Sequence, residues 1–339
     1  MGEVVVGVYL QNRVRPRLSP RIDAPPLRGI QSGPRKESVF VADGATSKTV
    51  RHERMPAWLK VKTGKASLTR KTRELLRGCG VCTVCEEAMC PNIGECFSSG
   101  TATFMILGDR CTRNCRFCAV THGTPAPPDP DEPAHVAEAA ARLGLEFVVL
   151  TCVTRDDLAD GGAGQFVATV EALRDRIPEV GVEVLTSDFA GNISPLERVL
   201  DSEPEVYNHN VETVPRLQPT VRPDADYERS LGVLRHAAEH AAPGTVIKSG
   251  LMVGLGETID EVGETLGDLA EAGCSVVTIG QYLRPSPRHL PVARYVPPVQ
   301  FEQLERMGAR RGLRRVLSGP FVRSSYHAAE TAAELGRGG

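Results

Sequence analysis

The sequence has no long apolar segment, almost no net charge and no recognisable secretory signal. No run approaches the roughly 18 apolar residues that a transmembrane helix needs, which excludes a helix that spans a membrane. The formal net charge is −2, so bulk charge does not favour a nucleic-acid binder. Hydrophobic content of 41% and charged content of 24% are those of an ordinary globular protein. A chain of 339 residues fits either two domains or one α/β barrel.

Cysteine, in contrast, is plentiful and unevenly placed. Eight of the ten cysteines fall between positions 79 and 118. A disulfide scaffold is typically short and secreted, with its cysteines spread along the chain. Bunched cysteines in a long chain indicate metal ligation in a reducing compartment, so we expect a cytoplasmic protein. The full set is Cys79, Cys82, Cys85, Cys90, Cys96, Cys111, Cys115, Cys118, Cys152 and Cys274.

Two basic stretches precede and follow position 54. Residues 1–54 carry ten Lys and Arg against five acids, together with five prolines. An Arg-rich, acid-poor segment fits a mitochondrial or plastid transit peptide. The prolines interrupt the helix that a mitochondrial signal needs, and favour a loosely ordered bacterial extension or a start codon placed too early. The run Lys60–Arg77 is either a solvated face or a surface for an acidic macromolecule.

After residue 100, short apolar strands alternate with helical segments. Six strand–helix repeats of this kind predict a parallel sheet. No GxGxxG follows the first strand, so a dinucleotide-binding fold is poorly supported. We therefore predict a full or partial barrel, with the chemistry at the C-terminal ends of the strands. The expected strands are 101–107, 146–151, 182–186, 206–211, 245–253 and 275–283, and the expected helices are 133–143, 165–176, 195–200, 227–241, 258–272 and 300–311.

A first cysteine triad, Cys111-x3-Cys115-x2-Cys118, comes just after the first expected strand. Three thiolates suit three corners of a [4Fe–4S] cluster, which normally takes four cysteines, so one iron stays open. A structural zinc site is the alternative, but it requires four closed ligands. In this spacing the chain resembles the radical S-adenosylmethionine (SAM) superfamily.

That resemblance implies a cofactor and its binding residues. In the superfamily the open iron is chelated by SAM, and one electron from the cluster cleaves SAM to a 5′-deoxyadenosyl radical. A Gly-rich stretch after the second strand meets the methionyl group, and Asp157, Gly161 and Gly162 occupy that place here. Asn210 and Glu212 lie near the end of a later strand and point to the same mouth. For each of these five residues, a loop glycine or a strand-end cap is the alternative.

A second triad, Cys85-x4-Cys90-x5-Cys96, precedes the first. With two triads, the chain resembles lipoyl synthases from about residue 55 to residue 328. Further stretches carry the same resemblance: GTATFMILGDRCTRNCRFC, TRDDLADGGA, VYNHNVETVPRL, KSGLMVGLGET, GQYLRPSPRHLPVARYV and GPFVRSSYHA. The resemblance implies that the second triad holds an auxiliary [4Fe–4S] cluster. Its fourth ligand is Ser325, with Ser324 as the fallback. Cys79, Cys82, Cys152 and Cys274 are expected to be spectators.

The same resemblance implies a fold, an activity and partners. The fold is α/β, a partial (β/α)6 TIM-like barrel with N-terminal and C-terminal extensions closing over the barrel mouth. Its segments are a basic extension (1–54), an auxiliary-cluster segment (55–100), the barrel (101–312) and a C-terminal segment with the RSSY motif (313–339).

The implied activity is insertion of two sulfur atoms at C6 and C8 of a protein-bound octanoyl-lysine, giving lipoyl-lysine, with the auxiliary cluster as sulfur donor. The implied acceptors are the glycine-cleavage H protein and lipoyl domains of 2-oxoacid dehydrogenases. An electron donor such as ferredoxin or flavodoxin and an iron–sulfur carrier protein are also expected, but no nucleic acid and no membrane. Two alternatives remain: a radical enzyme whose auxiliary cluster only relays electrons, and a non-catalytic iron–sulfur scaffold or electron carrier.

Overall fold

A mainly parallel sheet forms the centre of the computed structural model, which describes residues 55–60 and 64–336. The strand order is β1-β2-β5-β6-β7-β8-β9-β10. Only β1 and β2 run antiparallel, and every later neighbouring pair is parallel. The strands are β1 (Cys82–Thr83), β2 (Thr103–Ile106), β5 (Phe147–Cys152), β6 (Gly181–Leu185), β7 (Val206–Asn208), β8 (Val246–Val253), β9 (Val276–Gln281) and β10 (Arg315–Gly319).

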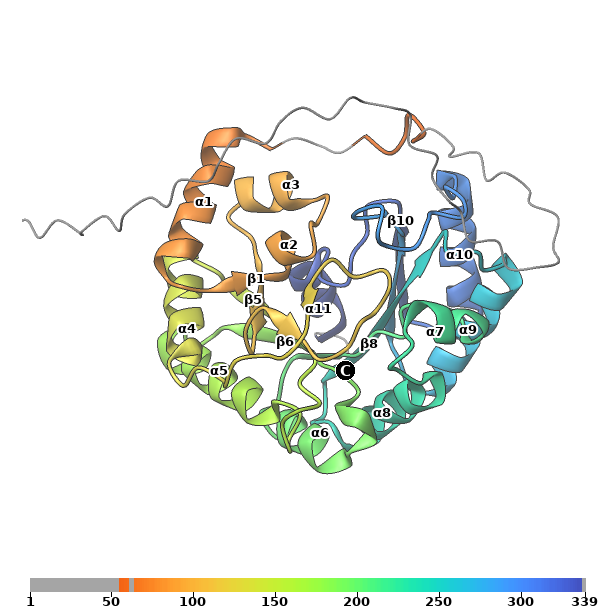
Figure 1. Cartoon of the computed structure of the whole chain (residues 1–339). Coiled ribbons are helices and arrows are strands. Elements are labelled where there is room, and N and C mark those ends of the chain that lie inside the picture. Colours follow the sequence, from red (N-terminus) through yellow and green to blue (C-terminus); the bar gives the residue numbers. More distant parts are fainter. Residues whose placement is uncertain (1–54, 61–63, 337–339) are drawn as a thin grey trace, which may run out of the picture. The chain divides into compact units, whose positions relative to one another are not determined.

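Helices connect successive strands and surround the sheet (Figure 1). Parallel strands need such crossovers, since a hairpin cannot join them. Local sequence sets the helix ends: Thr258 and Glu261 form a reciprocal capping box at the start of α9. The predicted partial barrel with its strand–helix repeats is confirmed. The outer helices are α4 (Glu132–Leu143), α5 (Ala163–Arg176), α6 (Ile193–Leu200), α8 (Tyr227–His240), α9 (Ile259–Glu271) and α10 (Pro298–Arg310).

The sheet differs from the prediction at two places. Strand β10 was not predicted, yet it pairs with β9 along its whole length. Strand β7 was predicted to reach residue 211 but ends at Asn208. The chain leaves the sheet there and meets β8 again at Glu212, which forms an isolated bridge with Leu251 and has a positive φ of 64°. This departure from the sheet places residues 209–211 and Glu212 at the C-terminal end of β7.

Three short helices precede β2 and pack beside the barrel: α1 (Ala66–Gly78), α2 (Val84–Glu87) and α3 (Ile93–Ser98). The Thr72 hydroxyl donates to the carbonyl of Phe97 at 2.6 Å, which joins α1 to α3. Residues 55–60 and 64–336 belong to one compact unit, while the predicted extension 1–54 lies outside the described residues. The segment boundaries predicted at 100 and 312 stay predictions. No helix within the described ranges is long and apolar enough to cross a membrane.

The C-terminal segment enters the barrel as well as approaching its mouth. Helix α11 (Ala328–Gly336) contacts both β5 and β8, and Figure 1 draws it in the middle of the ring of strands. Ala332 packs against Val206, Val246 and Val276. A Cβ at Gly280 of β9 would lie 2.2 Å from the carbonyl oxygen of Val322, so glycine is required for this close approach.

Candidate active site

The first triad lies on the loop that joins the two-stranded ladder of β3 (Arg110–Cys111) and β4 (Thr121–His122). This loop follows β2, at the C-terminal end of the sheet. Several segments hold it in place. The Thr112 N–H donates to Thr154 O at 3.0 Å, the Arg116 N–H to Val221 O at 2.9 Å, and His289 Nε2 to Cys118 O at 2.9 Å. The cysteine backbone is therefore fixed by regions that follow three different strands.

The thiols of this triad are partly shielded from solvent and close enough to influence one another. Burial is the main reason that the pKa of Cys115 is raised to about 11 and that of Cys118 to about 12, and the neighbouring cysteines contribute to both increases. Cys111 accepts a hydrogen bond at 3.3 Å from the Thr154 N–H to its Sγ. Metal coordination deprotonates such thiols, so these three sulfurs are free to become ligands once a cationic centre compensates their charge.

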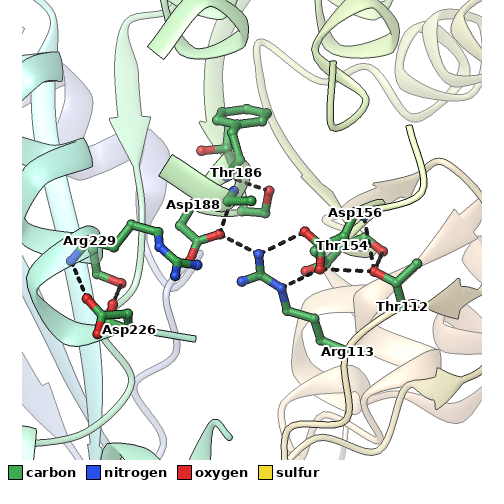
Figure 2. A network of polar contacts seen from close by, with 12 residues as sticks. Thr112, Arg113, Thr154, Asp156, Thr186, Asp188, Asp226 and Arg229 are labelled. Carbon is green, nitrogen blue, oxygen red and sulfur yellow. Dashed lines mark hydrogen bonds and ion pairs between the residues drawn. The ribbon is translucent and has the colours of Figure 1, made fainter. Parts of the chain in front are cut away.

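Arg113, between Cys111 and Cys115, anchors the loop through a buried ionic network (Figure 2). Its Nε and Nη2 donate to the two oxygens of Asp156 at 2.7 and 2.8 Å, and Nη2 also donates to Asp188 at 2.6 Å. Burial alone would lower the pKa of Arg113, but the hydrogen bonds to the two carboxylates outweigh it and raise the pKa. Nothing in the local sequence indicated either carboxylate as its partner.

The second triad sits on the short helices before β2. Cys85 lies in α2 and Cys96 in α3, with Cys90 between them. The pKa of Cys85 is raised to about 12, mainly by burial; hydrogen bonds to Thr103 oppose the increase, and Cys90 and Cys96 contribute to it. Burial likewise raises the pKa of Cys96 to about 11, and Cys90 contributes again. The three thiols therefore form one electrostatically coupled group.

The RSSY segment lies against this second triad. The Thr103 hydroxyl donates to Ser325 Oγ at 2.9 Å, and Thr103 also bonds to the Cys85 thiol. One residue earlier, the Ser324 hydroxyl donates to Asn210 Oδ1 at 2.8 Å, so it faces the end of β7 instead. The Asn92 side chain, within the triad segment, donates to the carbonyl of Phe321 at 2.7 Å. Of the two serines, Ser325 is therefore the one joined to a cysteine of the second triad by a shared hydrogen-bond partner.

Arg323 of the same motif has an unusual environment. Its guanidinium donates to the carbonyls of Val322 at 2.6 Å and Pro320 at 3.5 Å. Within the described part of the chain, no carboxylate forms an ion pair with it. Burial lowers the pKa of Arg323, and the charge of Cys90 acts against this shift. A half-buried cation therefore lies close enough to Cys90 of the second triad for the two charges to interact.

The residues predicted to contact SAM divide into two groups. Asp157 is turned toward Arg155, which donates to both of its oxygens at 2.9 Å. Gly161 and Gly162 have left-handed φ values of 58° and 91° just before α5, and a Cβ at Gly162 would come within 2.2 Å of Leu107. The two glycines thus have a structural reason for lacking a side chain, whatever they bind.

Asn210 and Glu212 lie on the other side of the mouth. Asn210 Nδ2 donates to Glu212 Oε1 at 3.1 Å. Burial raises the pKa of Glu212 against the opposing charge of Arg222, and the Glu212 charge in turn contributes to the raised pKa of Cys115. Glu212 is therefore brought to the first triad, whereas Asn210 joins it to the RSSY segment.

Two further residues near the site, Arg222 and Glu257, were not predicted from the sequence. Arg222 donates to the carbonyls of Asn210 and Val211, both at 3.1 Å. The buried carboxylate of Glu257 accepts from the N–H groups of Gly254 at 2.7 Å and Leu255 at 2.9 Å, and so fixes the turn after β8. A glutamate three residues after a strand-end glycine was the available signal.

The donor set fits iron–sulfur clusters better than zinc. All ten cysteines are free of disulfides. Among the described residues, no three His, Cys, Asp or Glu side chains converge on the place of one metal ion, whereas a structural zinc ion needs four such ligands around one point. In a cubane cluster each cysteine binds a different iron, so the three sulfurs surround a larger volume. Two sets of neighbouring thiols, partly or fully shielded from solvent, suit that arrangement.

The four predicted spectators are scattered. Cys79 lies 3.5 Å from Arg142 Nη1, and Cys82 pairs with Met105 in the short antiparallel ladder. Burial raises the pKa of Cys152 and of Cys274 to about 12. The charge of Cys111 adds to the shift of Cys152, which places Cys152 near the first triad. Their role as spectators stays a prediction.

Comparison with known proteins agrees with this geometry. Residues 105–269 match the family model of the Radical SAM superfamily. HydG, a maturase of the [FeFe]-hydrogenase, has the same fold, with a TM-score of 0.50 and 13% identity over 73% of this chain and 62% of that one. The chain is thus a radical SAM protein with an incomplete α/β barrel.

Sequence relatives narrow the class further. The chain is 54% identical to the lipoyl synthase of Methylococcus capsulatus, over 84% of this chain and 88% of the relative. It is 52% identical to that of Rubrobacter xylanophilus, over 85% and 89%. The chain belongs to the lipoyl synthase family. It is an enzyme of the radical SAM sulfurtransferase type, and family membership implies SAM and [4Fe–4S] clusters as its cofactors and lipoyl-domain proteins as its substrates.

Proposed function

We propose that this chain inserts sulfur at C6 and C8 of an octanoyl-lysine carried on a protein domain, with the second triad holding the cluster that donates the sulfur. One observation carries the assignment. Thr103 bonds to both the Cys85 thiol and the Ser325 hydroxyl, so a hydroxyl from the C-terminal segment lies near the one buried thiol of the second triad. A serine oxygen is a harder and weaker ligand for iron than a thiolate, which suits an iron that must leave.

The two triads have separate tasks in this proposal. When bound, the clusters and SAM supply the one-electron cleavage, the hydrogen abstraction and the sulfur. Cys111, Cys115 and Cys118 hold the first cluster and leave one iron open for SAM. Cys85, Cys90, Cys96 and Ser325 hold the second. The chain's own contribution is to keep both sets of thiols buried and immobile, and to keep water away from the reacting carbon.

The residues at the mouth support SAM in the same proposal. Gly161 and Gly162 let the loop before α5 pass close to Phe189 and Leu107. The buried carboxylate of Glu212, together with Asn210, faces the triad from the opposite side. Asp157 contributes through its ion pair with Arg155, which in turn donates to the Leu107 carbonyl at 3.2 Å. These five residues position SAM rather than take part in bond breaking.

The partners follow from the same chemistry. The acceptors are the H protein of glycine cleavage and the lipoyl domains of 2-oxoacid dehydrogenases. A ferredoxin or flavodoxin supplies electrons, and an iron–sulfur carrier restores the consumed cluster. Ten free thiols require a reducing compartment, which supports the cytoplasm.

The decisive experiment is mass spectrometry of an octanoylated H protein after anaerobic incubation with reconstituted enzyme, SAM and reductant. The proposal expects the mass of two added sulfurs less the hydrogens removed. Release of 5′-deoxyadenosine without added sulfur would favour an electron-relay cluster. No release of 5′-deoxyadenosine would favour a non-catalytic carrier.

A further inference from the structure

The loop of the first triad contains two arginines in contrasting positions. The Arg113 side chain is only 5% exposed, whereas Arg116 projects from the surface. Burying a guanidinium is costly unless carboxylates pair with it. Burial of the Arg113 guanidinium is therefore costly unless its carboxylate partners compensate for it. These partners indicate which segments Arg113 holds together.

Those partners lie beyond the ends of two neighbouring strands. Asp156 follows β5 and receives two parallel hydrogen bonds from Arg113, an arrangement that fixes orientation as well as distance. Asp188 follows β6, is fully buried, and also accepts from Arg229 of α8 at 3.3 Å. Figure 2 shows Arg113 between the two carboxylates. The loop is thus fastened across β5 and β6 at once.

The same fastening locks Thr112 against the segment after β5. The Thr112 N–H and hydroxyl both donate to the Thr154 carbonyl at 3.0 Å, and the Asp156 N–H donates to the Thr112 hydroxyl at 3.1 Å. With this register fixed, the Thr154 N–H points to Cys111 Sγ at 3.3 Å. Hydrogen bonds to ligand sulfurs stabilise added negative charge, and so set the reduction potential of an iron–sulfur centre.

We propose that Arg113 is a positioning residue for the first cluster: by binding Asp156 and Asp188 it maintains the Thr112–Thr154 register that directs the Thr154 N–H to Cys111, and thereby sets how readily that cluster is reduced. This inference rests on the proposed function only in taking Cys111 as a cluster ligand. Positioning by Arg113 is distinct from the direct effect of its positive charge on the cluster.

The first test separates geometry from charge. In reconstituted full-length protein, the cluster whose electron paramagnetic resonance signal changes on adding SAM is titrated for its midpoint potential. Arg113→Lys keeps the charge but loses the paired hydrogen bonds. We expect reduction to become about tenfold less favourable, which is about 59 mV for one electron. The matched control, Arg116→Gln, removes a charge from the exposed part of the same loop and should shift the equilibrium less than about twofold.

The second test uses the sign of the shift. Asp156→Ala removes a negative charge, so simple Coulomb interaction would make reduction easier. Loss of the Thr154 hydrogen bond makes it harder, and we expect this direction. An easier reduction, or an unchanged potential in both Arg113→Lys and Asp156→Ala, overturns the proposal.

A third measurement does not need the cluster. In cluster-free protein, amide hydrogen exchange of residues 111–118 should become faster in Arg113→Lys and stay at the wild-type rate in Arg116→Gln. Equal exchange in all three proteins contradicts the positioning role. If instead wild-type protein shows no SAM-responsive cluster at all, the proposed function fails, and this outcome is distinct from an unchanged potential.

Discussion

The two cysteine triads have the same ligand chemistry but differently balanced surroundings. In the first, the buried Arg113 is neutralised by Asp156 and Asp188 before any cofactor binds. In the second, the half-buried Arg323 donates to carbonyl oxygens and lies near Cys90, without a carboxylate partner among the described residues. The first site is complete as a protein structure, whereas the second keeps a positive charge that an anionic cluster would balance. The proposed function, in which the first cluster survives each cycle and the second is rebuilt, would call for this difference.

The largest effects are expected when ligands are removed from one triad at a time, which tests whether the two triads have separate tasks. Reconstituted wild-type protein should hold about eight irons, and loss of either cluster should leave about four. Cys115→Ala should abolish 5′-deoxyadenosine release and keep the second cluster. Cys85→Ala with Cys90→Ala should keep this release and lose lipoyl formation. Iron analysis with product assays decides, and lipoyl product from the Cys85/Cys90 double variant would refute the sulfur-donor assignment.

The next largest effect is expected at Ser325. Ser325→Ala leaves three thiols, so much of the second cluster should still assemble, while lipoyl formation falls at least about tenfold. SAM cleavage should fall less, because the first triad is untouched. Ser325→Cys should give a more stable cluster and slower sulfur release, since thiolate binds iron more tightly.

Two variants serve as controls for that result. Ser324→Ala removes the hydroxyl that bonds to Asn210 and should retain more product than Ser325→Ala. Product ratios per 5′-deoxyadenosine released give the comparison. Normal lipoyl formation by Ser325→Ala, together with a loss in Ser324→Ala, would move the ligand to the other serine. Normal product from both would support the relay alternative.

A smaller effect is expected from the basic run next to the second triad. Reversal of Lys62, Lys65 and Lys71 to Glu should raise the apparent KM for a protein-borne octanoyl substrate about tenfold at low salt. The effect should fade with salt, as the Debye length falls from ~10 Å at 0.1 M to ~3 Å at 1 M. Lys71 is exposed on α1, and Lys65 is exposed just before the helix begins. Lys62 lies outside the described residues.

An uncharged octanoyl-lysine peptide is the matched substrate for this experiment. Its KM should be nearly unchanged, because it presents no acidic surface to the run. An equal loss on both substrates would indicate a folding defect. An unchanged KM for both substrates would indicate that the basic run is an ordinary solvated face.

The smallest effects are expected at the other four cysteines. Cys79→Ser, Cys82→Ser, Cys152→Ser and Cys274→Ser should each leave iron content near the wild-type value. Cys152 is the informative member, because it is buried near Cys111 without belonging to either motif. Loss of about four irons in any one of these variants would show that a triad had been chosen wrongly.

The sequence predicted the repeating part of the fold well because its strands are continuous apolar runs. Thr101–Leu107, for example, contains β2, whose residues are all buried. Strand β10 escaped prediction because RVLSG is short and mixes a charge, a hydroxyl and a glycine with its apolar residues. It is stabilised by pairing with β9, a tertiary effect that local propensity does not register.

The site was predictable only where its residues are close in sequence. Cys111, Cys115 and Cys118 share one loop, so spacing alone indicated a cluster. Asp188 is 75 positions from Arg113, and no local pattern links them. The ligand role of Ser325 came from resemblance, since a serine near a C-terminus carries no chemical signal of its own.

The hydrogen bond from Thr103 to Ser325 joins residues 222 positions apart, and this has a consequence for biosynthesis. The ribosome releases the segment with Cys85, Cys90 and Cys96 long before it makes the last strand and the RSSY motif. A nascent chain can therefore fold the thiol half of the second site while its hydroxyl half does not yet exist. Under the proposed function, loading of the second cluster is therefore best timed after termination, because a chain that stops before Ser325 has the barrel strands but lacks the hydroxyl of that site.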